Sequence, residues 1–267
     1  MTDLTSSKIQ ESYSNEDMQA VLFQILNLGE LLLESGAEVH RVEDTIRRLC
    51  RAYGFGRTDV FTITSSIVVT AVTGDGQPIT QTRRIYSIST DLGQIDRLNS
   101  LSRRLCKTPV PLDLLKAEIA AAGEKNPPNA LLICLTYAGI SAAFSVFFGG
   151  SGLDPLAAAL SGSLLFLLLS ASRHMLYMSG LFQQMVCSAL TGVAVMLLCR
   201  IGIGVHPDKI MIGNVMLVIP GLQLTTSLRD MLNGDIITGG LNLVEAILKA
   251  TAVAAGFALP WAYIHFI

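Results

Sequence analysis

Charged residues are scarce in this sequence, and they are scarcest in its second half. They make up 15% of the 267 residues, whereas a typical soluble domain has about 25%. Residues 129–267 hold only five basic and five acidic side chains, and between Pro127 and Ser172 the single charged residue is Asp154. This scarcity excludes an ordinary soluble domain for the second half and indicates membrane-spanning helices.

Several motifs that would carry chemistry are also missing. The net charge is −2 and no basic run alternates with aromatic residues, so we expect no nucleic-acid partner. The five cysteines form no C-x-x-C pair, which favours free thiols. Neither H-E-x-x-H nor G-x-S-x-G occurs, and the sequence therefore predicts no enzyme and no cofactor.

One group of possible metal ligands lies near the junction of the first two helices. Glu34, Glu38, His40 and Glu43 gather near one helix junction. Glu38 and His40 are only two positions apart, which directs them to different faces of a helix. We therefore predict no metal site.

Residues 1–126 are predicted to form a small cytosolic α/β domain. The first twenty residues are polar and acidic, unlike a secretory signal. Apolar residues recur at helical spacing over 16–35, and Gly36 ends that helix before a second one starts. The run 58–72 is rich in Val, Ile and Thr and predicts one strand, followed by a turn and a second strand. Two helices are expected near 91–106 and 111–122.

Residues 127–267 are predicted to form a transmembrane helical domain of about five spans. Each apolar segment approaches the roughly 20 residues that a span needs. The expected spans are 129–149, 155–172, 176–199, 209–227 and 241–266. The first break carries no cation and the second holds Arg173 and His174, which places the second break and the N-terminal domain in the cytosol. We expect a multi-pass protein of the plasma (inner) membrane.

The fourth span combines a helix break with a polar stripe. Pro220 has no N–H, so the carbonyl of Met216 loses its helical partner, and Gly221 allows close approach of backbone or ligand. Such breaks are typical of transporter helices that bind cargo. Beyond the break, helical spacing places four polar residues on one face, namely Gln223, Thr226, Asp230 and Asn233.

Two other spans carry polar stripes. Glu245 and Lys249 have the favourable i, i+4 spacing, with Asn242 on the same face. Gln184, Ser188 and Thr191 line up on the third span. A structural alternative is that these residues pair at the membrane surface or join helices. Because intramembrane ionisable residues usually mark a transport path, a transporter is favoured over a non-transporting membrane scaffold.

Two long stretches, "LLLESGAEVHRVEDTIRRLCRAYGF" and "VIPGLQLTTSLRDMLNGDIITGGLNLVEA", resemble the threonine/serine exporter family. The resemblance covers roughly residues 18–260. It implies a cytosolic α/β domain followed by about five membrane helices, and export of threonine and serine driven by the proton-motive force. A related two-component subgroup is associated with succinate export, which stays open as an alternative.

The resemblance also implies the site residues. The downstream signature falls on Pro220, Gly221, Arg229, Asp230, Asn233, Gly234, Asp235 and Gly239. The upstream signature falls on Ser35, Gly36, Glu38, Arg41, Val42 and Glu43; we interpret Glu38, Arg41 and Glu43 mainly as ion pairs on a helix surface. Family members of full length carry a second membrane half, so this chain resembles the first half of a split exporter.

The chemistry of the cargo suggests roles for these residues. Arg229 or a helix N-terminus suits a carboxylate, and Asp230 suits an ammonium group. Gln223, Thr226 or Asn233 suits a hydroxyl, and Arg229 with Lys249 suits a dicarboxylate. Asp230 and Glu245 are the candidate proton carriers. We expect a second small membrane subunit, or a homo-oligomer, because the polar stripes would face lipid unless another protein surface covers them.

Overall fold

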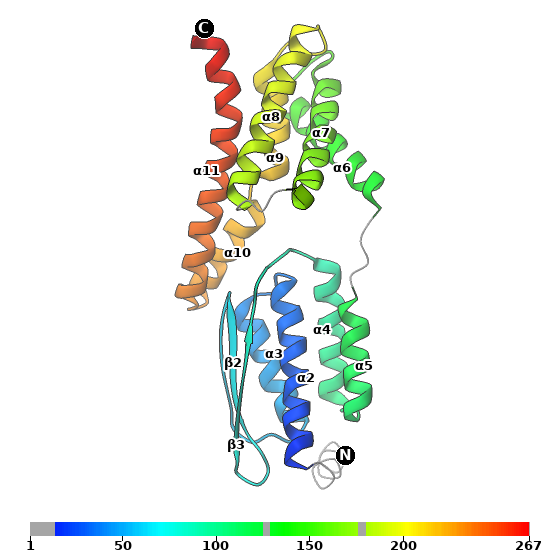
Figure 1. The fold of residues 1–267 in the computed structure, drawn as a ribbon, viewed down its shortest axis with the longest axis vertical. Coiled ribbons are helices and arrows are strands. Elements are labelled where there is room, and N and C mark those ends of the chain that lie inside the picture. Colours follow the sequence, from blue (N-terminus) through cyan, green and yellow to red (C-terminus); the bar gives the residue numbers. More distant parts are fainter. Residues whose placement is uncertain (1–13, 125–128, 176–179, 267) are drawn as a thin grey trace. The chain divides into compact units, whose positions relative to one another are not determined.

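A computed structural model describes residues 14–124, 129–175 and 180–266, apart from the side chains of 173–175 and 263–266. This description leaves out Pro127 and Pro128, where the second predicted domain begins. It also leaves out the start of the predicted third span and the side chains of Arg173 and His174. The chain forms two compact units. The first unit comprises Met1–Asn126 and Thr226–Gly240, and the second comprises Pro127–Thr225 and Leu241–Ile267. Figure 1 gives the labels of the elements.

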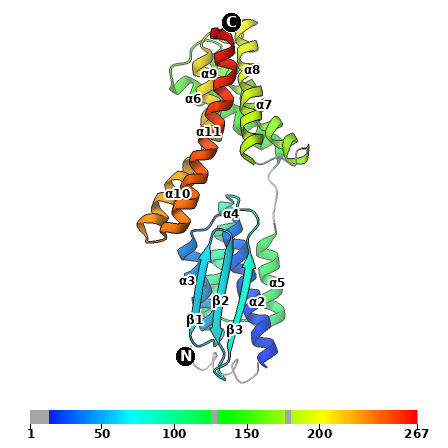
Figure 2. The same cartoon turned by 60° about the vertical axis from the view of Figure 1, so that its left-hand side comes forward.

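The N-terminal part of the first unit has three layers. Its elements are α2 (Asn15–Glu34), α3 (Val39–Ala52), β1 (Thr58–Ile63), β2 (Ser66–Val72), β3 (Pro78–Arg84), α4 (Leu92–Lys107) and α5 (Leu112–Gly123). The strands form an antiparallel sheet in the order β1-β2-β3, and they lie side by side across α2 and α3 (Figure 2). Helices α4 and α5 cover the other side of this helix pair.

The single strand expected over 58–72 is wrong, because the chain reverses at Thr64 and Ser65. Strands β1 and β2 pair directly on either side of this turn, with Ile63 opposite Ser66. The turn itself contains no Gly, Pro, Asn or Asp, the residues that usually signal a turn, and Ser and Thr favour turns more weakly. The sheet therefore has three strands, and the rest of the expected helix and strand order is confirmed.

The apolar spacing of the first two helices produces the core of this unit. The inward faces of α2 and α3 meet the inward residues of β2, and all are buried: Val21, Leu22, Ile25, Leu28, Leu32, Val42, Ile46, Leu49, Ile67, Val69 and Ala71. Gly36 ends α2 in the left-handed region, with φ +88°, as expected for a residue just past a helix end.

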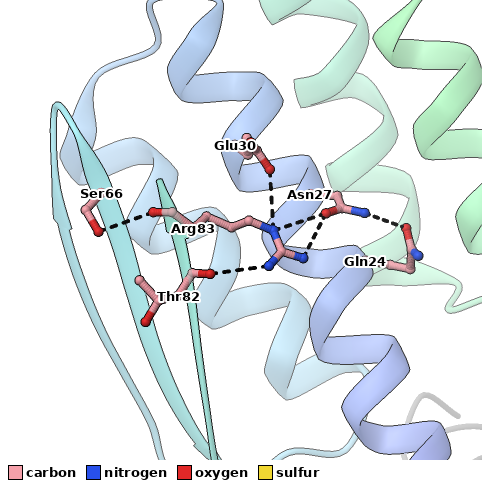
Figure 3. Close-up of polar contacts among 6 residues, drawn as sticks. All are labelled: Gln24, Asn27, Glu30, Ser66, Thr82 and Arg83. Atoms are coloured by element: carbon pink, nitrogen blue, oxygen red, sulfur yellow. Dashed lines mark hydrogen bonds and ion pairs between the residues drawn. The ribbon is translucent and has the colours of Figure 1, made fainter. Parts of the chain in front are cut away.

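An arginine joins α2 to the edge strand β3. The Arg83 guanidinium donates to Asn27 Oδ1 from Nε (3.3 Å) and from Nη2 (3.1 Å) (Figure 3). It also lies 3.4 Å from Glu30 Oε2 and 4.0 Å from the centre of the Phe23 ring. These contacts attach the edge strand β3 to α2. An edge strand without such attachment can pair with a strand of another chain.

The second unit contains most of the membrane-spanning helices. Its elements are α6 (Ala130–Phe147), α7 (Asp154–Met175), α8 (Gly180–Arg200), α9 (Pro207–Val218), the start of α10 (Gly221–Leu232) and most of α11 (Ile236–Phe266). Among the residues that the structure describes, four helices are long and apolar enough to span a membrane, and α9 with α10 makes a fifth candidate that is bent by 48°. The chain is thus a multi-pass membrane protein.

Helices α6, α7 and α9 pack around a fully buried asparagine. The Asn214 Nδ2 donates to Ser161 Oγ (2.8 Å), and Ser141 Oγ donates to Asn214 Oδ1 (3.1 Å). Beside it, a β-carbon at Gly213 would collide with the Ser141 carbonyl oxygen. Small residues and interhelical hydrogen bonds are the usual means of joining membrane helices. These polar residues are isolated within apolar runs, so the sequence did not predict that they would contact one another.

The end of α10 packs tightly against the start of α11. We call this segment, Thr226–Gly240, the tip. A β-carbon at Gly239 would lie 2.5 Å from Met231 Cγ and 2.6 Å from the Ser227 carbonyl oxygen. The next residue, Gly240, has nothing within 4 Å of such a carbon. Gly239 is therefore required by packing, whereas Gly240 is not.

We expect the Cys50 thiol to resist alkylation in the folded protein. Its side chain is fully buried among α3 neighbours, and burial raises the pKa of this thiol to about 12. The thiolate is the reactive form, so iodoacetamide should label Cys50 at neutral pH only after unfolding in concentrated urea. Mass spectrometry of the peptide checks this, and equal labelling with and without urea would contradict it.

The two neighbouring glycines of the tip give a matched pair. Gly239→Ala should destabilise the chain by about 1–3 kcal/mol, because the added methyl group overpacks the helix contact. Gly240→Ala should be neutral or stabilising by up to about 1 kcal/mol, since alanine favours helix. The measurement is the melting temperature of the purified full chain in mild detergent. Indistinguishable melting temperatures for the two variants would show that the tip is loosely packed.

Candidate functional site

The fourth span breaks where the sequence analysis expects it to. Helix α9 ends at Val218, Ile219 takes an extended backbone (φ −62°, ψ 129°), and α10 begins at Gly221. The residue before a proline is disfavoured in the helical region, which explains the extended Ile219. In a continuous helix the Val218 carbonyl would accept from residue 222. In this structure the Val218 carbonyl accepts a hydrogen bond from Gln184 Nε2 of α8, at 3.2 Å.

A glutamine of α10 lies between two opposite charges of α11. The Lys249 ammonium is 2.8 Å from Glu245 Oε1 and donates to Gln223 Oε1 at 3.0 Å. Gln223 Nε2 donates in turn to Glu245 Oε2 (3.2 Å) and to the Asn242 carbonyl oxygen (3.4 Å). We call Gln223, Glu245 and Lys249 the bridge cluster. It joins the two helices directly after the break.

The bridge cluster is still open to its surroundings. The side chain of Glu245 is 54% exposed and that of Lys249 is 34% exposed. Charges within an apolar span are costly unless they pair, and the ion pair with its bridging amide lowers that cost. A ligand that carries one ammonium and one carboxylate group offers the same two charges, so it can replace either partner without leaving the other unpaired.

The expected four-residue stripe on α10 is shortened to three. Gln223, Thr226 and Asp230 lie on the helix, but α10 ends at Leu232, and Asn233 belongs to the turn that follows. Gly234 adopts φ +98° in that turn. The Asn233 amide donates to the Arg229 carbonyl, and the Asp235 amide donates to the Asp230 carbonyl. These bonds close the helix end and lead the chain into α11.

The buried acid of the tip is already covered by its own unit. Asp230 is only 5% exposed, so the expectation that its stripe needs another bundle for cover is wrong for this residue. Asp235 is half-buried, and its Oδ2 has no hydrogen-bond partner within the described residues. The tip thus holds two carboxyl groups that are removed from solvent to different degrees.

Within the first unit, the two sequence signatures meet. Arg229 Nη1 donates to Glu38 Oε1, across 191 positions of sequence. The other oxygen of Glu38 lies 3.5 Å from Arg41 Nε and 3.9 Å from His40 Nδ1. Glu38 is 15% exposed, whereas the Arg229 side chain is 62% exposed. The expected Glu38–Arg41 pair is present, and Arg229 joins it.

The remaining members of the upstream signature support the fold. Glu43 Oε1 accepts from the Thr62 amide on the outer edge of β1 (2.9 Å), and its other oxygen accepts from Arg47 (2.7 Å). A β-carbon at Gly36 would lie 2.9 Å from the Ser89 carbonyl oxygen. Glu43 and Gly36 therefore position the edge strand and the helix junction. The sequence predicted the junction at Gly36 but not the contact of Glu43 with β1.

The four residues considered for a metal are arranged for other contacts. His40 lies closer to Glu38 than helical spacing indicates, because Glu38 precedes α3 with an extended backbone. Glu43 is occupied by Arg47 and Thr62. Among the residues that the structure describes, no three His, Cys, Asp or Glu side chains gather as a metal site.

The polar stripe on the third span divides into two kinds of residue. Gln184 reaches the break, as described, but Ser188 and Thr191 are fully buried. A β-carbon at Gly256 of α11 would lie 2.6 Å from Ser188 Cβ, and Thr191 Oγ1 donates to the Cys187 carbonyl of its own helix at 2.8 Å. Ser188 and Thr191 therefore lie at a helix contact, as the structural alternative proposed.

The chain is similar to known proteins along most of its length. The threonine/serine exporter (ThrE) family matches residues 24–263. A protein of Mycobacterium tuberculosis named "Probable threonine/serine exporter" is 24% identical over 240 residues, covering 88% of this chain and 45% of its own. The "Threonine/serine exporter" of Corynebacterium glutamicum is 23% identical over 246 residues, which cover 87% of this chain and 49% of the relative's length. No solved structure matches the chain significantly.

The chain spans about half the length of these two relatives. The family match includes both sequence signatures, the broken span and the bridge cluster. The chain therefore belongs to the threonine/serine exporter family.

Proposed function

We propose that this chain is a component of a secondary transporter that exports threonine and serine. Family membership and the names of the two relatives support this proposal. The observation that carries it is the bridge cluster, where Glu245 and Lys249 are held together by Gln223 beside a helix break. Secondary transporters bind cargo at such breaks.

An amino-acid cargo matches the groups near the break. Its ammonium group would bind Glu245 and its carboxylate would bind Lys249, each replacing half of the existing ion pair. The N-terminus of α10 at Gly221 adds the positive end of a helix dipole for the carboxylate. Gln223 and Thr226 are the candidates to recognise the hydroxyl of threonine or serine. Arg229 and Asp230 would meet the carboxylate and the ammonium at the tip.

We propose the proton-motive force as the driving force. Coupling requires a carboxyl group that gains a proton on one side of the membrane and loses it on the other. Asp230, within the tip, and Glu245, on the helix that follows it, are the candidates because they are carboxyl groups on the helices α10 and α11. We further propose the inner membrane as the location, with residues 1–126 in the cytosol, because that part is charged and the second unit is apolar.

We also propose that the chain works as one half of a two-component exporter. Transporter sites commonly form between two repeats. The exposed Glu245 and Lys249 side chains would face lipid unless a second membrane protein covers them. A second small membrane subunit is the expected partner, and a homo-oligomer is the alternative.

Charge removal within the bridge cluster tests the function. In vesicles with and without a pH gradient, we expect Glu245→Gln to lower transport of labelled serine and threonine about ten- to hundredfold, as for loss of one charged hydrogen bond. Asp208→Asn is the matched control, because this acid pairs with Lys209 at the start of α9. Transport of succinate alone would favour the dicarboxylate alternative, full transport by Glu245→Gln would reject the bridge cluster as the cargo site, and no transport by the unaltered chain would favour a scaffold.

The proposed partner is tested by mass and by activity. We expect light scattering of the chain in mild detergent to show an oligomer, or liposomes to require co-expressed membrane partners for export. The physical reason is that two open charges of α11 need a protein surface against them. A monomer that exports serine by itself would contradict this prediction.

A further inference from the structure

The side chain of Glu38 does not serve the helix that it begins. It occupies the N-cap position of α3 but makes no capping hydrogen bond there. Ser, Thr, Asp and Asn are the residues that usually cap a helix. The Glu38 carboxylate instead points to cations, with Arg229 on one oxygen and Arg41 and His40 near the other.

Arg229 keeps capacity for a second carboxylate. A guanidinium has five N–H donors and favours carboxylates, and the described contacts assign one of these donors, Nη1, to Glu38. The side chain of Arg229 is 62% exposed. Ion pairs with one largely exposed partner are weak, so a carboxylate from solution can exchange with Glu38.

We propose that Glu38 is a built-in carboxylate that occupies the carboxylate-binding position of Arg229 and gives way to the carboxylate of the cargo. Glu38 is thus a positioning residue that sets the apparent affinity for cargo. This inference rests on the proposed function and names the chemistry of one part of that site. The ligand class is a small solute with a free carboxylate, either an amino acid or a dicarboxylate.

Competition predicts the direction of the effect. An internal carboxylate that must leave before cargo binds raises the apparent KM, as any competing state does. Removing its charge should therefore improve binding, which is the opposite of what loss of a cargo-binding residue would do. The expected gain is up to about fivefold, the equivalent of one exposed ion pair.

The test uses the full chain in vesicles, together with the partner if export requires it. Glu38→Gln should lower the KM for serine or succinate about two- to fivefold without lowering the maximal rate. In an Arg229→Gln background the same change should leave the KM unaltered, which separates the pair from other effects. Asp44→Asn is the matched control, since this α3 acid forms its ion pair with Arg48 on the same helix.

A second readout keeps this inference separate from the transport function. Amide hydrogen exchange over residues 36–42 of the full chain should rise when serine or succinate is added, and it should not rise with serine methyl ester, which lacks the carboxylate. A response without any transport would retain the inference and reject the proposed function. The inference would be overturned if the KM of Glu38→Gln were unchanged or higher, or if none of the three solutes changed the rate of amide exchange over residues 36–42.

Discussion

An apolar environment makes an unpaired polar group of a membrane helix costly, and several contacts of this chain lower that cost. Next to the break at Pro220, the Val218 carbonyl accepts a hydrogen bond from Gln184 of a different helix. Asn214 accepts from the Ser141 hydroxyl and donates to the Ser161 hydroxyl, on two further helices. In lipid, an unsatisfied backbone group costs several kcal/mol, so these side chains are what permit an irregular backbone at this depth.

The same constraint explains why the charges of the bridge cluster are paired. Glu245 and Lys249 satisfy each other along one helix, and Gln223 adds a donor and an acceptor from the neighbouring helix. A charge pair of this kind is stable when empty and is complementary to a zwitterion when occupied. A site with only one sign of charge would be costly without its ligand. Paired charges therefore suit a transporter, whose site must exist in both loaded and empty states.

The tip shows a different solution to the same problem. Its residues belong to the first unit, where Glu38 partners Arg229 and the unit buries Asp230. Gly239 allows the two helices of the tip to approach closely enough to cover these groups. The glycines and charges of the downstream signature thus have separate physical tasks, since Gly234 and Gly239 fix the backbone whereas Arg229 binds Glu38 of the upstream signature.

Much of this architecture is determined by sequence alone. Apolar length predicts the spans, the Pro-Gly pair predicts the break, Gly36 predicts the end of the first helix, and the i, i+4 spacing predicts the Glu245–Lys249 pair, because all of these are local properties of the chain. Tertiary structure decided what meets across distance. Helical spacing could not show that Gln223 would lie against the Glu245–Lys249 pair, that Ser188 and Thr191 would be buried while Glu245 stays open, or that Glu38 would reach Arg229 across 191 positions. Those contacts depend on how helix faces are rotated against one another, and a single helix carries no record of its neighbours.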